Sequence, residues 1–75
     1  MLESIASILS NVADIDPKSI TPEHDLIDGL GLSSLDIVNL IVMFEDEFNI
    51  EIPDRQIMKF VTVGDVVEYI ENNRQ

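Results

Sequence analysis

A fifteen-residue run in the middle of the chain, residues 34–48, restricts the possible folds more than any other segment. Nine of its residues are apolar, and Ser33 and Asp36 form an S-x-x-D pattern at its start. Apolar residues at helical intervals after such a capping pattern predict an amphipathic helix over Ser34–Phe48. The stripe expected to face a core is Ile37, Leu40, Ile41, Phe44 and Phe48. We do not expect so small a domain to bury both faces fully, so the second stripe, Leu35, Val38 and Val42, is a candidate contact surface.

The chain before this run predicts one helix and a long loop. The helix should end within Asp14–Pro17, because the residue before a proline avoids the helical conformation. Residues 14–31 contain two prolines and two glycines, so we expect a loop held to the core, with one helical turn at Thr21–Glu23 capped by Thr21. The apolar residues of the helix are Leu2, Ile5, Ile8, Leu9 and Val12, and those of the loop are Ile15, Ile20, Leu26, Ile27 and Leu30.

The chain after residue 48 predicts an extended linker, a short helix and a final helix. The short helix should cover Asp54–Lys59 with Asp54 as its cap, and Thr62–Asp65 is another capping pattern. The inward face of the final helix should be Val63, Val66, Val67 and Ile70. We therefore predict a single all-α domain over residues 1–75. It is a small bundle of three main helices plus one short helix, with a long loop between helices one and two.

The charge balance narrows the range of partners. Fifteen acidic residues against four Lys and Arg give a net charge of −11. This acidity argues against nucleic acid and against an anionic membrane surface, both of which need clustered basic residues. It favours protein partners with basic docking patches. The chain contains no Cys, which fits a reducing compartment, and no apolar run approaches the length of a membrane span. We expect a cytoplasmic monomer.

Candidate catalytic and metal-binding groups are sparse. His24 is the only histidine, and no cysteine or positioned base accompanies the serines, so we do not expect an enzyme. A solvated position in the loop is the simplest interpretation of His24. The acidic stretches Asp14–Lys18 and Asp25–Gly29 lack the ligand spacing of a calcium-binding loop, so we expect no dedicated metal site.

The stretch Gly29–Asp36 places two serines where a flexible loop meets a helix start. A phosphate attached there would lie near free backbone N–H groups and the positive end of the helix dipole. Serine is also a common helix cap, so local features alone leave both serines as capping residues or either one as a modification site.

Several motifs along the chain together resemble acyl carrier proteins. The resemblance covers nearly the whole sequence, and the length, the acidity and the order of predicted helices agree with it. The matching segments are Leu30–Asp36, Val38–Leu40, Phe44–Phe48, Ile50–Asp54, Thr62–Asp65 and Tyr69–Ile70.

This resemblance implies a carrier and its cofactor. A phosphopantetheinyl transferase would move 4′-phosphopantetheine from coenzyme A to the serine before the motif leucine, here Ser34. The thiol of that arm would carry acyl groups as thioesters, most commonly in fatty acid biosynthesis. The second helix would dock basic surfaces of the transferase and of acyl-transfer and fatty-acid synthesis enzymes. The docking residues expected there are Leu35, Asp36, Val38, Val42, Glu45, Asp46 and Glu47.

Three departures from the family pattern keep other functions open. Gly29, Ser33 and Asn39 stand where acyl carrier proteins often have acidic residues. A specialised carrier for a dedicated acyl, polyketide or aminoacyl pathway is therefore an alternative. From a different class, a non-carrying acidic adaptor could dock through the stripe of Leu35, Val38 and Val42. A calcium sensor is the third alternative.

Overall fold

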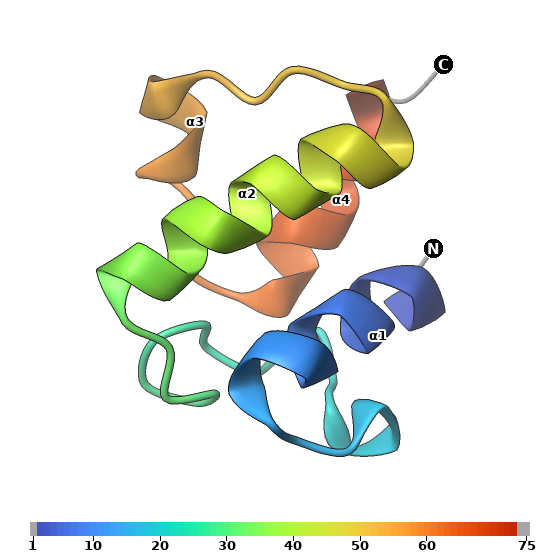
Figure 1. Ribbon diagram of the computed structural model, residues 1–75, viewed down its shortest axis with the longest axis vertical. Coiled ribbons are helices and arrows are strands. Elements are labelled where there is room, and N and C mark those ends of the chain that lie inside the picture. The colour runs from blue at the N-terminus through green and yellow to red at the C-terminus, as the bar shows by residue number, and fades with distance from the viewer. Residues whose placement is uncertain (1, 74–75) are drawn as a thin grey trace.

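The computed structural model describes residues 2–73, which form the predicted all-α bundle (Figure 1). The long loop between the first two main helices is present, and the residues described include one isolated β-bridge, Asp25 to Thr62, but no strand. No helix among these residues is long and apolar enough to cross a membrane. The elements in chain order are α1 Leu2–Ala13, the 3-10 helix η1 Pro17–Ser19, α2 Ser34–Phe48, α3 Asp54–Ile57 and α4 Val63–Asn73.

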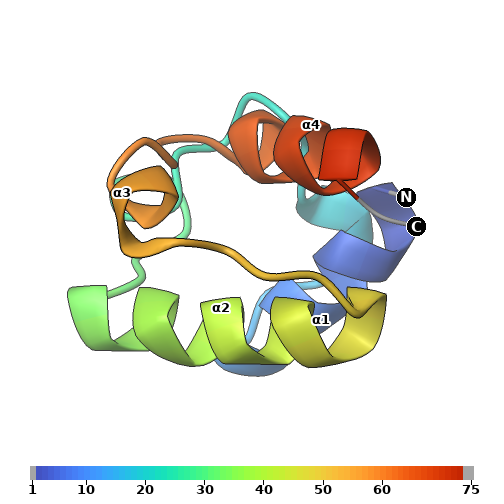
Figure 2. The ribbon, with the colours of Figure 1, turned by 90° about the horizontal axis from the view of Figure 1, so that it is seen from above.

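The three main helices enclose the core with the faces that their spacing predicts. Seen from above, α2 and α4 lie on opposite sides of the molecule, while α3 and the start of α2 share one end (Figure 2). Ile37, Phe48 and Val67, predicted to face inward, are only partly buried and pack against the core. The buried residues of the helices are Ile5, Ala6 and Leu9 of α1, Leu40, Ile41 and Phe44 of α2, and Val63, Val66 and Ile70 of α4.

The long loop is held by buried side chains and by hydrogen bonds to the start of α4. Leu26 N–H donates to Val61 O at 2.9 Å, Val63 N–H donates to His24 O at 2.9 Å, and Gly64 N–H donates to Pro22 O at 2.9 Å. The loop residues buried in the core are Ile20, Leu26, Leu30 and Leu32. The expectation that Ile27 also helps hold the loop is wrong, because its side chain is 54% exposed.

Two short helical segments differ from the prediction. The helical segment of the loop is η1, where the Asp16 carboxylate accepts from Lys18 N–H at 2.9 Å. At Thr21–Glu23 the chain forms only a single turn, in which His24 N–H donates to Thr21 O at 3.1 Å. The Thr21 hydroxyl faces His24 Nδ1 at 3.2 Å and caps no helix. Helix α3 ends at Ile57, and its N-cap is Pro53 without a side-chain hydrogen bond, so Asp54 is not the cap. In both places local composition favours a turn without fixing which residue starts it.

Candidate functional site

The start of α2 is a complete capping box. Ser33 is the N-cap in an extended conformation, and its hydroxyl oxygen accepts from Asp36 N–H at 3.2 Å. The Asp36 carboxylate accepts in return from Ser33 N–H at 3.0 Å. This confirms the predicted pairing and the predicted bounds of the helix. The Ser33 hydroxyl is therefore committed to the backbone of its own helix.

The loop that enters α2 alternates between buried and exposed residues. Leu30 and Leu32 are buried, while Gly31 between them is exposed and has a left-handed φ of 72°, which glycine adopts at little cost. Hydrogen bonds from Gly31 N–H to Ile27 O at 3.0 Å and from Leu32 N–H to Leu26 O at 3.2 Å fix this path. The two leucines anchor the loop, and the residues after them emerge at the surface.

Gly29 has a steric reason to replace an acidic residue. A Cβ atom at this position would lie 2.7 Å from both the backbone N and the backbone O of Asp25. Gly29 N–H donates to Asp25 O at 3.0 Å, so the chain turns tightly on itself here. This path of the loop excludes any larger side chain, whatever its charge.

Ser34 is the first residue of α2 and is exposed. Its hydroxyl takes part in neither bond of the capping box. Within residues 2–73, no backbone carbonyl accepts from the N–H groups of Ser34 and Leu35, as is usual in the first turn of a helix. A hydroxyl free of the cap thus lies beside free N–H donors and the positive end of the helix dipole.

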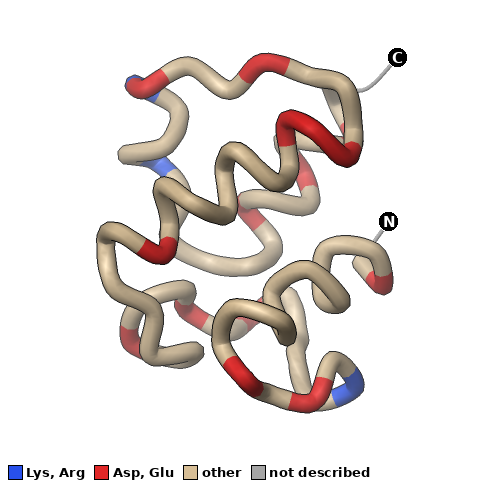
Figure 3. The backbone as a smooth tube through the Cα atoms, viewed as in Figure 1, with Lys and Arg blue, Asp and Glu red and all other residues tan. Residues whose placement is uncertain are grey.

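The predicted docking residues of α2 have different surroundings. Leu35, Val38 and Val42 are 72%, 52% and 60% exposed and form one apolar stripe, as the spacing predicts. Asp46 and Glu47 are exposed at the far end of the helix. Figure 3 shows acidic positions near both ends of α2 and none along its middle.

Two of the predicted docking residues also support the fold. Asp36 is half-buried in the capping box, and half-buried Glu45 accepts from Ile52 N–H at 2.9 Å through Oε2. That bond ties the linker between α2 and α3 to the last turns of α2. Sequence analysis missed it because the partners are seven residues apart and belong to different elements.

His24 is part of the loop's internal structure. It is half-buried, and its Nδ1 accepts from Thr21 N–H at 3.0 Å. His24 is therefore not the simply solvated loop residue that the sequence predicts. The ring helps to shape the loop beside the start of α4.

Comparison with known proteins decides the family. A family model described as the phosphopantetheine attachment site matches residues 3–70. The chain belongs to the acyl carrier protein family. It is 46% identical to the acyl carrier protein of Helicobacter pylori strain J99 over 74 residues, covering 99% of this chain and 95% of that protein. It is 43% identical to that of Helicobacter acinonychis with the same coverage.

Solved structures agree with this assignment. An acyl carrier protein from Mycobacterium tuberculosis matches with a TM-score of 0.88 at 34% identity, covering 96% of this chain and 97% of that one. An acyl carrier protein from Enterococcus faecalis matches with a TM-score of 0.83 at 36% identity, covering 96% and 91%. The chain is thus a non-catalytic carrier of acyl thioesters that works through a covalently attached 4′-phosphopantetheine group.

Proposed function

We propose that the 4′-phosphopantetheine arm is attached to Ser34 and that the carrier serves fatty acid biosynthesis. The assignment rests on one observation, the different hydrogen bonding of two adjacent serines. Ser33 accepts from the backbone of α2, whereas exposed Ser34 keeps its hydroxyl outside the capping box. Ser34 also directly precedes Leu35, as the attachment serine does in the motif that this chain resembles.

The surroundings of Ser34 fit a phosphate ester. The free N–H groups of the first turn and the positive end of the α2 dipole stabilise negative charge at this position. Attachment forms a bond between Ser34 Oγ and the β-phosphorus of coenzyme A and breaks the pyrophosphate linkage, so that the adenosine-containing half leaves. The hydroxyl proton passes to a base on the transferase, since the nearby Asp36 carboxylate already accepts from Ser33 N–H in the capping box. When bound, the arm supplies the thiol that holds acyl groups.

The exposed face of α2 is the proposed docking surface for the transferase and for the synthesis enzymes. Its apolar stripe of Leu35, Val38 and Val42 supplies the centre, and Asp46 and Glu47 supply exposed acidic groups. Charges at a rim steer a basic partner and raise the association rate, while buried apolar contact slows dissociation. Asp36 and Glu45 contribute charge to this face as well as their hydrogen bonds within the fold.

The proposal takes the chain to be a cytoplasmic monomer with one domain. The match to curated relatives over 99% of this chain and 95% of the Helicobacter pylori protein supports a single domain. The net charge of −11 supports a monomer, because copies of the chain repel one another. It also supports partners with basic surfaces and disfavours nucleic acid.

Intact mass spectrometry tests the proposed carrier role. The purified apo chain is incubated with coenzyme A, Mg²⁺ and a phosphopantetheinyl transferase, with a control reaction that omits coenzyme A. The proposal predicts that the chain gains the mass of one phosphopantetheine moiety in the complete reaction and no mass in the control. A non-carrying adaptor would gain no mass. Mass analysis of the protein from its native cell then identifies the acyl group, and cargo other than fatty acyl intermediates would contradict the proposed pathway.

A further inference from the structure

A second exposed apolar surface lies away from the α2 stripe. Ile27 of the long loop is 54% exposed, and Met58 and Val61 of the segment between α3 and α4 are 85% and 58% exposed. Together with Phe60 and the acidic residues Asp25 and Asp28 they line one groove. We call Ile27, Met58 and Val61 the loop–α3 patch.

The fold does not need these side chains at the surface. Their neighbours Leu26 and Phe60 already supply the buried residues of the two segments, which leaves the patch facing outward. Single exposed apolar residues are ordinary, but three from two segments that line a common groove indicate a contact surface.

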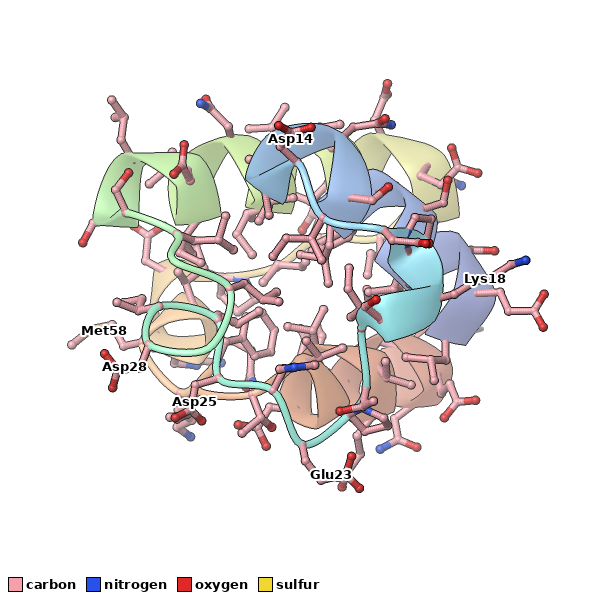
Figure 4. The ribbon with its side chains drawn as sticks, turned by 90° about the horizontal axis from the view of Figure 1, so that it is seen from below. Asp14, Lys18, Glu23, Asp25, Asp28 and Met58 are labelled. Atoms are coloured by element: carbon pink, nitrogen blue, oxygen red, sulfur yellow. The ribbon has the colours of Figure 1, made fainter. Side chains whose placement is uncertain are left out.

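The loop–α3 patch shares one side of the molecule with the start of α2. In Figures 1 and 2, α3, the loop before α2 and the first turn of α2 lie at the same end. Figure 4 shows Met58 and Asp28 projecting from that end, with Asp25 close by along the loop. An enzyme that reaches Ser34 therefore approaches this patch as well.

We propose that the loop–α3 patch is a second docking point for the phosphopantetheinyl transferase, which places there an apolar side chain flanked by Lys or Arg. This inference rests on the proposed attachment at Ser34. Asp25 and Asp28 at the groove supply the negative charge that such a partner complements. A second copy of this chain fits poorly, because a symmetric contact would bring these carboxylates together between two molecules of net charge −11.

Steady-state kinetics of the transferase test the patch. The variant Met58→Ser removes an apolar side chain without changing charge, and its exposure means that the fold is retained, which circular dichroism checks. The control is Ser19→Ala, a charge-neutral change at an exposed residue of η1. Figure 4 shows the neighbouring Lys18 on the opposite side of the molecule from Met58. We expect Met58→Ser to lower kcat/KM at least about fivefold, the effect of a contact residue whose truncation matters, and Ser19→Ala to stay within about twofold of the wild type.

The outcomes separate this inference from the proposed function. If the wild type is modified and Met58→Ser matches it in kcat/KM, the patch is not a docking point, and attachment at Ser34 is untouched. If the wild type gains no phosphopantetheine, the proposed function fails and the patch loses its partner with it. Sedimentation that finds a dimer dissolved by Met58→Ser would assign the patch to a second copy and overturn the inference.

Discussion

Helices α2 and α4 begin with the same capping box, but the residue after the cap has opposite surroundings. In α2 the box joins Ser33 and Asp36, and the next residue, Ser34, is exposed. In α4 the Thr62 hydroxyl accepts from Asp65 N–H at 3.2 Å and the Asp65 carboxylate accepts from Thr62 N–H at 3.0 Å. There the next residue is Val63, which is 0% exposed.

The difference comes from what covers each helix start. The long loop lies against α4, where His24 O accepts from Val63 N–H and Pro22 O accepts from Gly64 N–H, each at 2.9 Å. The corresponding N–H groups of Ser34 and Leu35 in α2 have no such carbonyl partner among residues 2–73. The same capping box thus begins α4, whose first residues are covered by the loop, and α2, whose first residues are exposed.

Among substitutions at the two helix starts, the change at Ser34 is expected to have the largest effect. In Ser34→Ala the proposed attachment hydroxyl is gone and the remaining Ser33 hydroxyl is committed to the cap, so the gain of mass should be abolished. The free energy of unfolding should change by less than about 0.5 kcal/mol, because the residue is exposed and outside the capping bonds. Intact mass and denaturant titration of the same sample check both halves. A modified Ser34→Ala variant would show that the arm is attached elsewhere.

The equivalent change in α4 should have the opposite result. Val63→Ala truncates a fully buried side chain and should cost about 1.5–3 kcal/mol of unfolding free energy, including the cavity left behind. The folded variant should still be modified at the wild-type level. Chemical denaturation and the transferase assay measure the two quantities, and a large loss of modification in folded Val63→Ala would mean that the two helix starts are not separate in function.

Removal of either cap should have a smaller and similar effect. Ser33→Ala and Thr62→Ala each lose a hydroxyl that accepts from the third residue of its helix, which should cost about 0.5–2 kcal/mol. Ser33→Ala should remain a substrate of the transferase. Thermal unfolding and intact mass check this, and a Ser33→Ala protein that is stable but unmodified would reverse the roles assigned to the two serines.

The smallest expected effect concerns the pH dependence of the α4 cap. Asp65 accepts from both Thr62 N–H and Val61 N–H, each at 3.0 Å, and these bonds lower its pKa below the ordinary value of 3.8. Because the pKa of Asp65 is lower in the folded protein than in the unfolded chain, its ionised carboxylate stabilises the fold above pH 3.8. This contribution is lost as the pH falls through the folded pKa. The difference in unfolding free energy between wild type and Asp65→Asn should therefore be constant near neutral pH and shrink as the pH falls below 3.8. A difference that does not change over this range would show that the charge of Asp65 does not stabilise the α4 cap.

Sequence reasoning succeeds where the structure depends on neighbouring residues. The bounds of α2 and both capping boxes follow from patterns four residues long, and the exposed stripe of Leu35, Val38 and Val42 follows from helical spacing. It fails where distant segments decide. The bond between Glu45 and Ile52 and the contact of the loop with the start of α4 depend on tertiary packing. The loop–α3 patch also joins residues from two separate segments, and no local pattern relates Ile27 to Met58.

Localisation of the arm on the wild-type protein tests the central claim most directly, namely that capping separates the roles of two adjacent serines. The transferase-modified chain is digested, and the peptide that contains Ser33 and Ser34 is fragmented by tandem mass spectrometry. The account predicts that the added mass lies on Ser34 in all of the modified peptide. Added mass on Ser33, or divided between the two serines, would contradict it.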